Sequence, residues 1–107
     1  MTTLAHLASN QFIISRLTTT SGYLMDYSTV TGCKGNLQPA SPSKTESFDG
    51  VMGKTFTIYV DGTIDVAEED KFKDIDTGKV YKVMTGGVTR RTMGAIDYAE
   101  VTVVEVN

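Results

Sequence analysis

Cysteine, histidine and tryptophan are nearly missing from this chain of 107 residues, which has one cysteine, one histidine and no tryptophan. The single Cys33 excludes a disulfide within the chain, and one cysteine with one histidine cannot supply the usual ligands of a zinc site. His6 has no serine or cysteine motif beside it, so a catalytic triad is not favoured. Although a cation such as Lys34 can activate a neighbouring thiol, we expect Cys33 to be a packed strand residue.

An excess of positive charge is also missing, since the formal net charge is -3. Binding to duplex DNA normally requires several lysine or arginine contacts with phosphates, so the composition disfavours DNA binding. No apolar run approaches the ~20 residues of a membrane helix, and the first residues lack the basic and apolar regions of a signal peptide. We therefore expect a soluble protein with no membrane partner.

Helical periodicity is hard to find after the first dozen residues. β-branched and aromatic residues recur instead between glycine, aspartate and asparagine, and in TFTIYVD the residues Phe56, Ile58 and Val60 alternate with polar ones. A phase shift near Ala99 predicts a bulge in the last strand. About six strands are predicted, at 10–18, 22–32, 55–61, 63–66, 79–84 and 95–107. This pattern predicts an all-β fold, a small antiparallel β-barrel forming a single domain over residues 1–107.

One polar segment, at about residues 39–54, is too long for a turn. It follows a strand ending in GCKGNLQP and contains both prolines of the chain. Loops beyond roughly 12 residues without structure of their own are uncommon and usually functional or disordered. Phe48, Val51 and Met52 add apolar side chains to this segment, as an interaction loop requires. We expect a long inserted loop that meets another protein.

Acidic residues gather before and within the turn sequence KDIDTGK: Asp65, Glu68, Glu69, Asp70, Asp74 and Asp76. Such oxygens can bind hard cations, but the downstream glutamate of a calcium loop is missing, so we expect solvated turns. Carboxylate pairs also hydrolyse glycosides, yet sequence spacing gives no distance across a barrel. We predict no catalytic residue, no metal and no cofactor.

Gly86-Gly87 and Arg90-Arg91 have the composition of an anion-binding loop. No nucleotide-binding glycine motif accompanies them, and we expect a flexible basic loop tip that docks on an acidic partner. The nine aromatic residues could form a base-stacking platform, but most fall within strand patterns and are expected in the core.

Three stretches together resemble the small head completion proteins of tailed bacteriophages, also called head-closure, stopper or head–tail joining proteins. They are YSTVTGCKGNLQP, then GVMGKTFTIYVDGTIDV, then EEDKFKDIDTGKVYKV, and they cover roughly residues 27 to 84. The shared pattern is a K-G-N-[LI]-Q-P strand, a variable loop, a [FY]-x-[IVL]-[YF]-V strand and a [VK]-Y-x-V strand. Glu69 departs from it, because the family often has glycine before the position of Asp70.

The resemblance implies a non-enzymatic virion protein of the phage neck, made in the host cytoplasm. Such a subunit forms a homo-oligomeric ring below the portal and adaptor rings, seals the DNA-filled capsid and gives the tail-completion or tail-terminator protein its attachment surface. Genomic DNA would pass through the ring without sequence-specific binding. The candidate interface residues are Lys34, Asn36, Gln38, Phe48, Val51, Met52, Arg90 and Arg91. Two alternatives stay open, a tail-completion or tail-terminator ring protein and a small single-stranded nucleic-acid-binding barrel.

Overall fold

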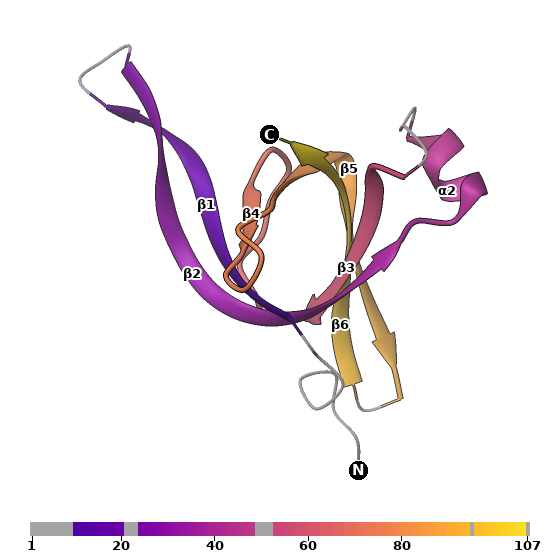
Figure 1. Cartoon of the computed structure of the whole chain (residues 1–107). Coiled ribbons are helices and arrows are strands. Elements are labelled where there is room, and N and C mark those ends of the chain that lie inside the picture. The colour runs from indigo at the N-terminus through magenta and orange to yellow at the C-terminus, as the bar shows by residue number, and fades with distance from the viewer. Residues whose placement is uncertain (1–9, 21–23, 49–52, 95, 107) are drawn as a thin grey trace.

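The computed structural model describes residues 10–20, 24–48, 53–94 and 96–106. These residues form β1 (Asn10–Thr20), β2 (Leu24–Pro39), α2 (Pro42–Ser47), β3 (Thr55–Asp61), β4 (Lys71–Asp74), β5 (Val80–Met93) and β6 (Ile96–Val106). Neighbouring strands are antiparallel and close a barrel in the order β1-β2-β3-β6-β5-β4 (Figure 1). The predicted all-β barrel is confirmed. In the described part of the chain no helix is long and apolar enough to cross a membrane.

The barrel interior is filled by alternate residues of its strands, as the period of two requires. Phe12 and Phe72 meet edge to face with ring centroids 5.6 Å apart, and Phe56 and Tyr81 do so at 5.4 Å. These rings are therefore part of the packing and not of an exposed platform. The buried apolar core consists of Phe12, Ile14, Ile58, Val60, Val66, Phe72, Tyr81, Val83, Ala99, Val101 and Val103.

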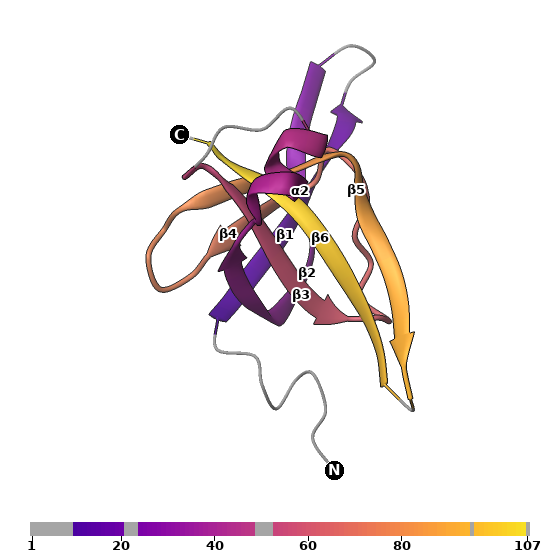
Figure 2. The same ribbon diagram turned by 90° about the vertical axis from the view of Figure 1, so that its right-hand side faces the viewer.

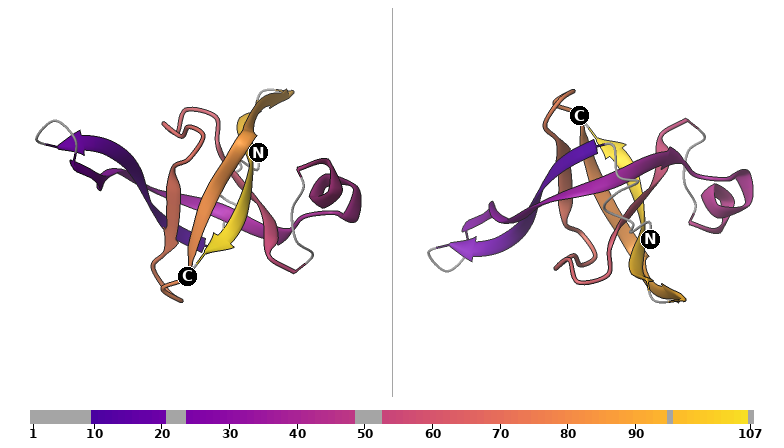
Figure 3. Two further views of the ribbon diagram at one scale, coloured as in Figure 1. Left: turned by 90° about the horizontal axis from the view of Figure 1, so that it is seen from above. Right: turned by 90° about the horizontal axis from the view of Figure 1, so that it is seen from below.

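Strands β1 and β2 are longer than the barrel and continue beyond it as a two-stranded arm. β4 pairs with β1 only over residues 12–15, and β3 pairs with β2 only over residues 35–39, whereas β1 and β2 stay paired to Thr20 and Leu24. Figure 3 shows this arm and α2 projecting on opposite sides of the barrel. The molecule is accordingly elongated, with extents of 47 × 29 × 25 Å.

The segment 63–66, predicted as a strand, instead belongs to the turns between β3 and β4. The carboxylate of Asp61 accepts hydrogen bonds from the amide and hydroxyl of Thr63, at 2.9 and 2.7 Å, which turns the chain after β3. The fourth strand of the chain is instead the four-residue KFKD, which the sequence patterns did not separate from the acidic run.

Residues 86–91 were predicted as a loop tip, and this was wrong because they lie inside β5. Gly86 has a φ of +73°, and a Cβ on Gly87 would stand 2.7 Å from the carbonyl oxygen of Thr102. The pair therefore forms a bulge, which shifts the β5–β6 register between Val83 and Val88. β6 pairs with β3 without a shift, so the bulge predicted near Ala99 in the last strand was wrong. The bulge lies in β5 instead, opposite residues 101–103.

Two acids of the predicted solvated turns are buried instead, since Asp70 and Asp74 are each 1% exposed. Asp70 accepts two hydrogen bonds from the guanidinium of Arg16, at 3.0 and 2.9 Å, and one from the amide of Ala67 at 2.8 Å. Asp74 accepts hydrogen bonds from the backbone amides of Asp76 and Thr77. Both carboxylates hold loops, which explains their burial. The turn predicted over Asp76, Thr77 and Gly78 is confirmed, with Gly78 at a φ of +77°.

Candidate interaction surface

The outward residues of β2 supply three of the predicted interface residues. Lys34, Asn36 and Gln38 alternate with Cys33, Gly35 and Leu37, which face the barrel interior or its rim. The side-chain amide of Gln38 donates to Asn36 Oδ1 at 3.0 Å. Lys34 is exposed and has no ion-pair partner among the described residues.

Gly35 allows β2 to cross this part of the barrel. A Cβ at Gly35 would stand 3.0 Å from both Ile58 and Val60 and 3.2 Å from Phe12, so β2 lies directly on the core here. Burial raises the pKa of the neighbouring Cys33 thiol to about 11, which disfavours a nucleophilic thiolate at neutral pH. Cys33 is thus a packed strand residue, as expected.

The predicted long loop contains the short helix α2. Ser41 caps it by accepting the amide of Lys44 at 3.2 Å, and Pro42 starts it without needing a hydrogen-bond donor. α2 lies over β3 and β6 (Figure 2). Thr45, a residue of α2, is only 3% exposed. The prediction of a long loop over residues 39–54 is therefore wrong where the structure describes this segment, because part of it is helical.

A charge network ties α2 to the barrel. The ammonium of Lys44 lies against Glu100 Oε1 and within 3.4 Å of the hydroxyl of Thr57, and Arg91 Nε donates to Glu100 Oε2 at 2.9 Å. The hydrogen bond from Lys44, with that from Arg91, holds the pKa of Glu100 below its usual range although burial opposes this. Burial, with the charge of Glu100, raises the pKa of Tyr59.

These groups define one outer surface, here named the α2 face: Asn36, Gln38, Lys44, Thr57, Tyr59, Arg91, Tyr98 and Glu100. The register places Asn36 beside Tyr59 and Tyr59 beside Glu100, and it also pairs Tyr98 with Arg91. Tyr59 and Tyr98 are neighbours with ring centroids 6.3 Å apart. Four strands, β2, β3, β6 and β5, thus bring sequence-distant candidates onto one surface.

Arg90 and Arg91 were predicted as a pair, and the strand separates them onto opposite sides of β5. Arg91 joins the α2 face. The guanidinium of Arg90 instead donates to the carbonyl oxygens of Gly62 and Ile64, at 2.6 and 3.1 Å, and fastens the chain that follows β3. Arg90 therefore has a holding role that the sequence did not indicate.

The apolar candidates of the loop are only partly described. Phe48 ends α2, is half-buried, and donates its amide to the carbonyl of Lys44 at 3.2 Å. Val51 and Met52 lie outside the described residues.

Sequence reasoning missed Lys44, Thr57 and Glu100, which hold α2 in place. The adjacent Ser41-Pro42 is a helix-start signal that could have identified the helix. No local signal links Lys44 to Glu100, because they are 56 positions apart.

Comparisons with known proteins add a fold relationship. No family model and no curated protein sequence matches the chain. The chain is similar to the solution structure of protein SF1141 from Shigella flexneri 2a, with 16% identity, a TM-score of 0.68 and 92% of each chain covered. At this identity the likeness shows the shared fold alone. Within the described ranges no group of three or more His, Cys, Asp or Glu side chains could hold a metal ion.

Proposed function

We propose that this protein is a ring-forming head-closure subunit of a tailed bacteriophage, acting through protein interfaces at the virion neck. The observation that carries the proposal is the shape of the subunit, a barrel with the β1–β2 arm on one side and α2 on the other (Figure 1). A subunit in a ring needs two different contact surfaces, because heterologous contacts that close by rotation generate rings. The arm and the α2 face are two such surfaces.

The corner at Glu69 adds support from the resemblance itself. Glu69 has a φ of +72°, in the left-handed region that favours glycine. This is the position at which the head completion family often has glycine. The conformation of the corner therefore agrees with the family pattern even though the side chain does not.

In this role the ring would contact portal and adaptor proteins above and a tail-completion or tail-terminator protein below. Asn36, Gln38 and Arg91 would contribute to these contacts from the α2 face, and Lys34 would contribute from β2 beside it. The surplus of acidic groups, a net charge of -3, would let DNA pass without retention. Catalysis has no part in this proposal.

The test is the mass of the protein alone and in the presence of DNA-filled tailless capsids, by light scattering and sedimentation. Binding to the capsids in a fixed small-ring stoichiometry is expected. The double variant Lys34→Ala/Gln38→Ala should bind fewer subunits per capsid, whereas Thr77→Ala/Lys79→Ala, in an exposed turn, should bind like the wild type. Failure of the wild-type protein to bind capsids would refute the proposal.

A further inference from the structure

The outer surface of β4 carries two lysines without carboxylate partners. Lys71 and Lys73 are two positions apart, so both point outward from the barrel. Neither takes part in any ion pair found among the described residues. Lys71 Nζ instead stands 4.3 Å from the ring centroid of Tyr27, a cation–π contact that orients the ammonium group.

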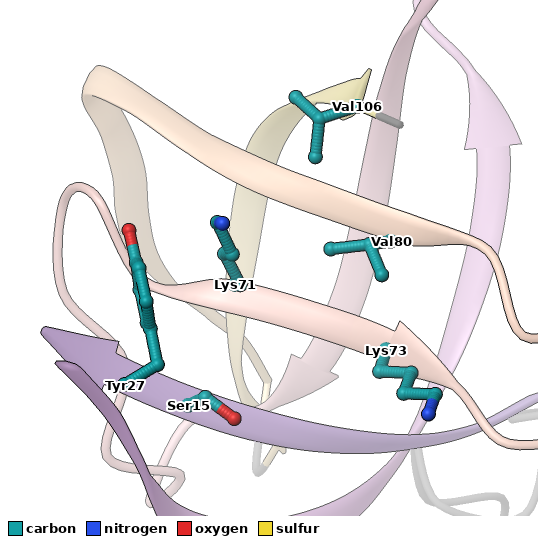
Figure 4. Close-up of a pocket in the computed structure, with 6 residues that line it drawn as sticks. All are labelled: Ser15, Tyr27, Lys71, Lys73, Val80 and Val106. Atoms are coloured by element: carbon teal, nitrogen blue, oxygen red, sulfur yellow. The ribbon is translucent and has the colours of Figure 1, made fainter.

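A shallow groove lies between these lysines, and Figure 4 shows its lining. Val80 and Val106 are paired across β5 and β6 and supply apolar surface, while Tyr27 stands at one end. We name this site the β4 groove, with the lining residues Ser15, Tyr27, Lys71, Lys73, Val80 and Val106.

The size of the groove limits what it can hold. Its volume is about 230 Å³, below the roughly 300–1,000 Å³ of pockets that enclose small molecules. One aliphatic side chain fits such a volume better than a whole cofactor does.

Lys71 and Lys73 give the groove positive charge that no carboxylate of the described residues pairs with. Lys82, the next lysine along the same surface, already pairs with Glu69 at 2.9 Å. The carboxylate of Asp74 faces away from the groove, buried against its own turn. Lys71 and Lys73 form no ion pair with the described residues and can therefore pair with an anion from another molecule.

We propose that the β4 groove binds an extended acidic segment of a partner protein. Two carboxylates of the segment pair with Lys71 and Lys73, and one aliphatic side chain inserts against Val80 and Val106. In an extended peptide, side chains two positions apart lie about 6.6 Å from each other on one face, the same repeat as the two lysines of β4. Charge complementarity supplies the orientation and the aliphatic contact the anchor.

Single-stranded nucleic acid is a poorer match to the same groove. Sequence-tolerant binding of bases relies on open aromatic faces on which they stack. Among the described residues, Tyr27 is the one aromatic side chain that lines the groove, and a face of its ring is covered by Lys71.

The proposal does not depend on the head-closure function, since the groove lies within a single subunit. The experiment therefore uses the isolated protein at low salt. Its probes are labelled short peptides with two glutamates two positions apart and one leucine at varied distance. Fluorescence anisotropy gives the affinity, and amide chemical shifts locate the bound peptide.

Binding that shifts the amides of Lys71, Lys73 and Val80 and weakens as salt rises is expected. The double reversal Lys71→Glu/Lys73→Glu should weaken binding at least about tenfold, because two favourable charge pairs become repulsive. The matched reversal Lys34→Glu/Lys54→Glu, at two exposed lysines outside the groove, should change it less than about twofold. Retained melting temperatures show that the variants fold.

The proposal is overturned by no binding of any acidic peptide, by equal weakening in the two double reversals, or by chemical shift changes confined to the α2 face. Tighter binding of oligothymidylate than of every acidic peptide would also overturn it and would favour a nucleic-acid site.

Discussion

The α2 face and the β4 groove are two outer surfaces of one barrel, and they treat their charges differently. On the α2 face the cations Lys44 and Arg91 both pair with Glu100, so each has a carboxylate partner within the chain. At the β4 groove, Lys71 and Lys73 have no carboxylate partner in the described residues. Cations paired within the chain contribute to the stability of the subunit, whereas Lys71 and Lys73 can pair fully with a partner's carboxylates.

The two surfaces also differ in how far the chain itself covers them. Thr57 and Thr102 point outward from β3 and β6 and are 3% and 2% exposed, because α2 covers this part of the sheet. Among the described residues no helix covers the β4 groove. The polar side chains beneath α2 are therefore covered by the chain itself, while the β4 groove is open in the described part of the chain.

The largest expected effect on stability comes from a substitution in the core at β4. Phe72 is fully buried and packs edge to face on Phe12. Phe72→Ala should lower the free energy of unfolding by about 3–5 kcal/mol. Leu17→Ala, at a side chain 39% exposed on β1, should cost less than about 1 kcal/mol. Chemical denaturation measures both, and equal losses would contradict the assignment of Phe72 to the core.

A smaller effect is expected when the two ion pairs of Glu100 on the α2 face are lost. Glu100→Gln should cost about 1–2 kcal/mol at neutral pH, because Lys44 and Arg91 lose a charged acceptor. Glu46→Gln, on the exposed side of α2, should change stability by less than about 0.5 kcal/mol.

The pH dependence of this difference has a definite sign. The folded pKa of Glu100 is lowered, so its stabilisation is present above the ordinary carboxyl pKa and is lost as pH falls through the folded value. The gap between wild type and Glu100→Gln should therefore shrink below about pH 4.3. Unfolding curves from neutral to acid pH measure it, and a gap that widens in acid would contradict the network.

The barrel was predictable because its strands alternate apolar and polar residues with period two. TFTIYVD keeps that alternation through β3 and matches the predicted bounds, 55–61. The same rule failed at KFKD and TIDV, since both are short and only tertiary contacts decide between them. Arg16 holds Asp70 and so starts β4 at Lys71.

The candidate surface was predictable only where it follows one strand. Lys34, Asn36 and Gln38 share the outer side of β2, as their spacing indicates. Arg90 and Arg91 were predicted to act together because they are adjacent in the sequence. Adjacent residues of a strand point to opposite sides. The Lys44–Glu100 contact depends on the β3–β6 register and on the placement of α2, and neither leaves a local pattern in the sequence.

A local effect is expected when the cap of α2 is removed. Ser41→Ala loses the acceptor for the amide of Lys44 and should destabilise the helix by about 1 kcal/mol. Hydrogen exchange at the amides of Thr45 and Phe48 should accelerate about fivefold, with the amide of Val83 in β5 unchanged. Equal acceleration at Val83 would mean that α2 and the barrel unfold as one unit.

The smallest expected effect on stability is at Lys73, and it sharpens the contrast between the surfaces most. Lys73 is exposed and forms no ion pair with the described residues, so Lys73→Ala should change the free energy of unfolding by less than about 0.5 kcal/mol. Lys44→Ala should cost about 1 kcal/mol, because it leaves Glu100 with one cation instead of two. The effect on acidic peptide binding should be reversed, with Lys73→Ala weakening it about three- to fivefold and Lys44→Ala leaving it unchanged. If Lys73→Ala destabilises the fold as much as Lys44→Ala does, the lysines of β4 are structural and the two surfaces do not differ in the way their charges suggest.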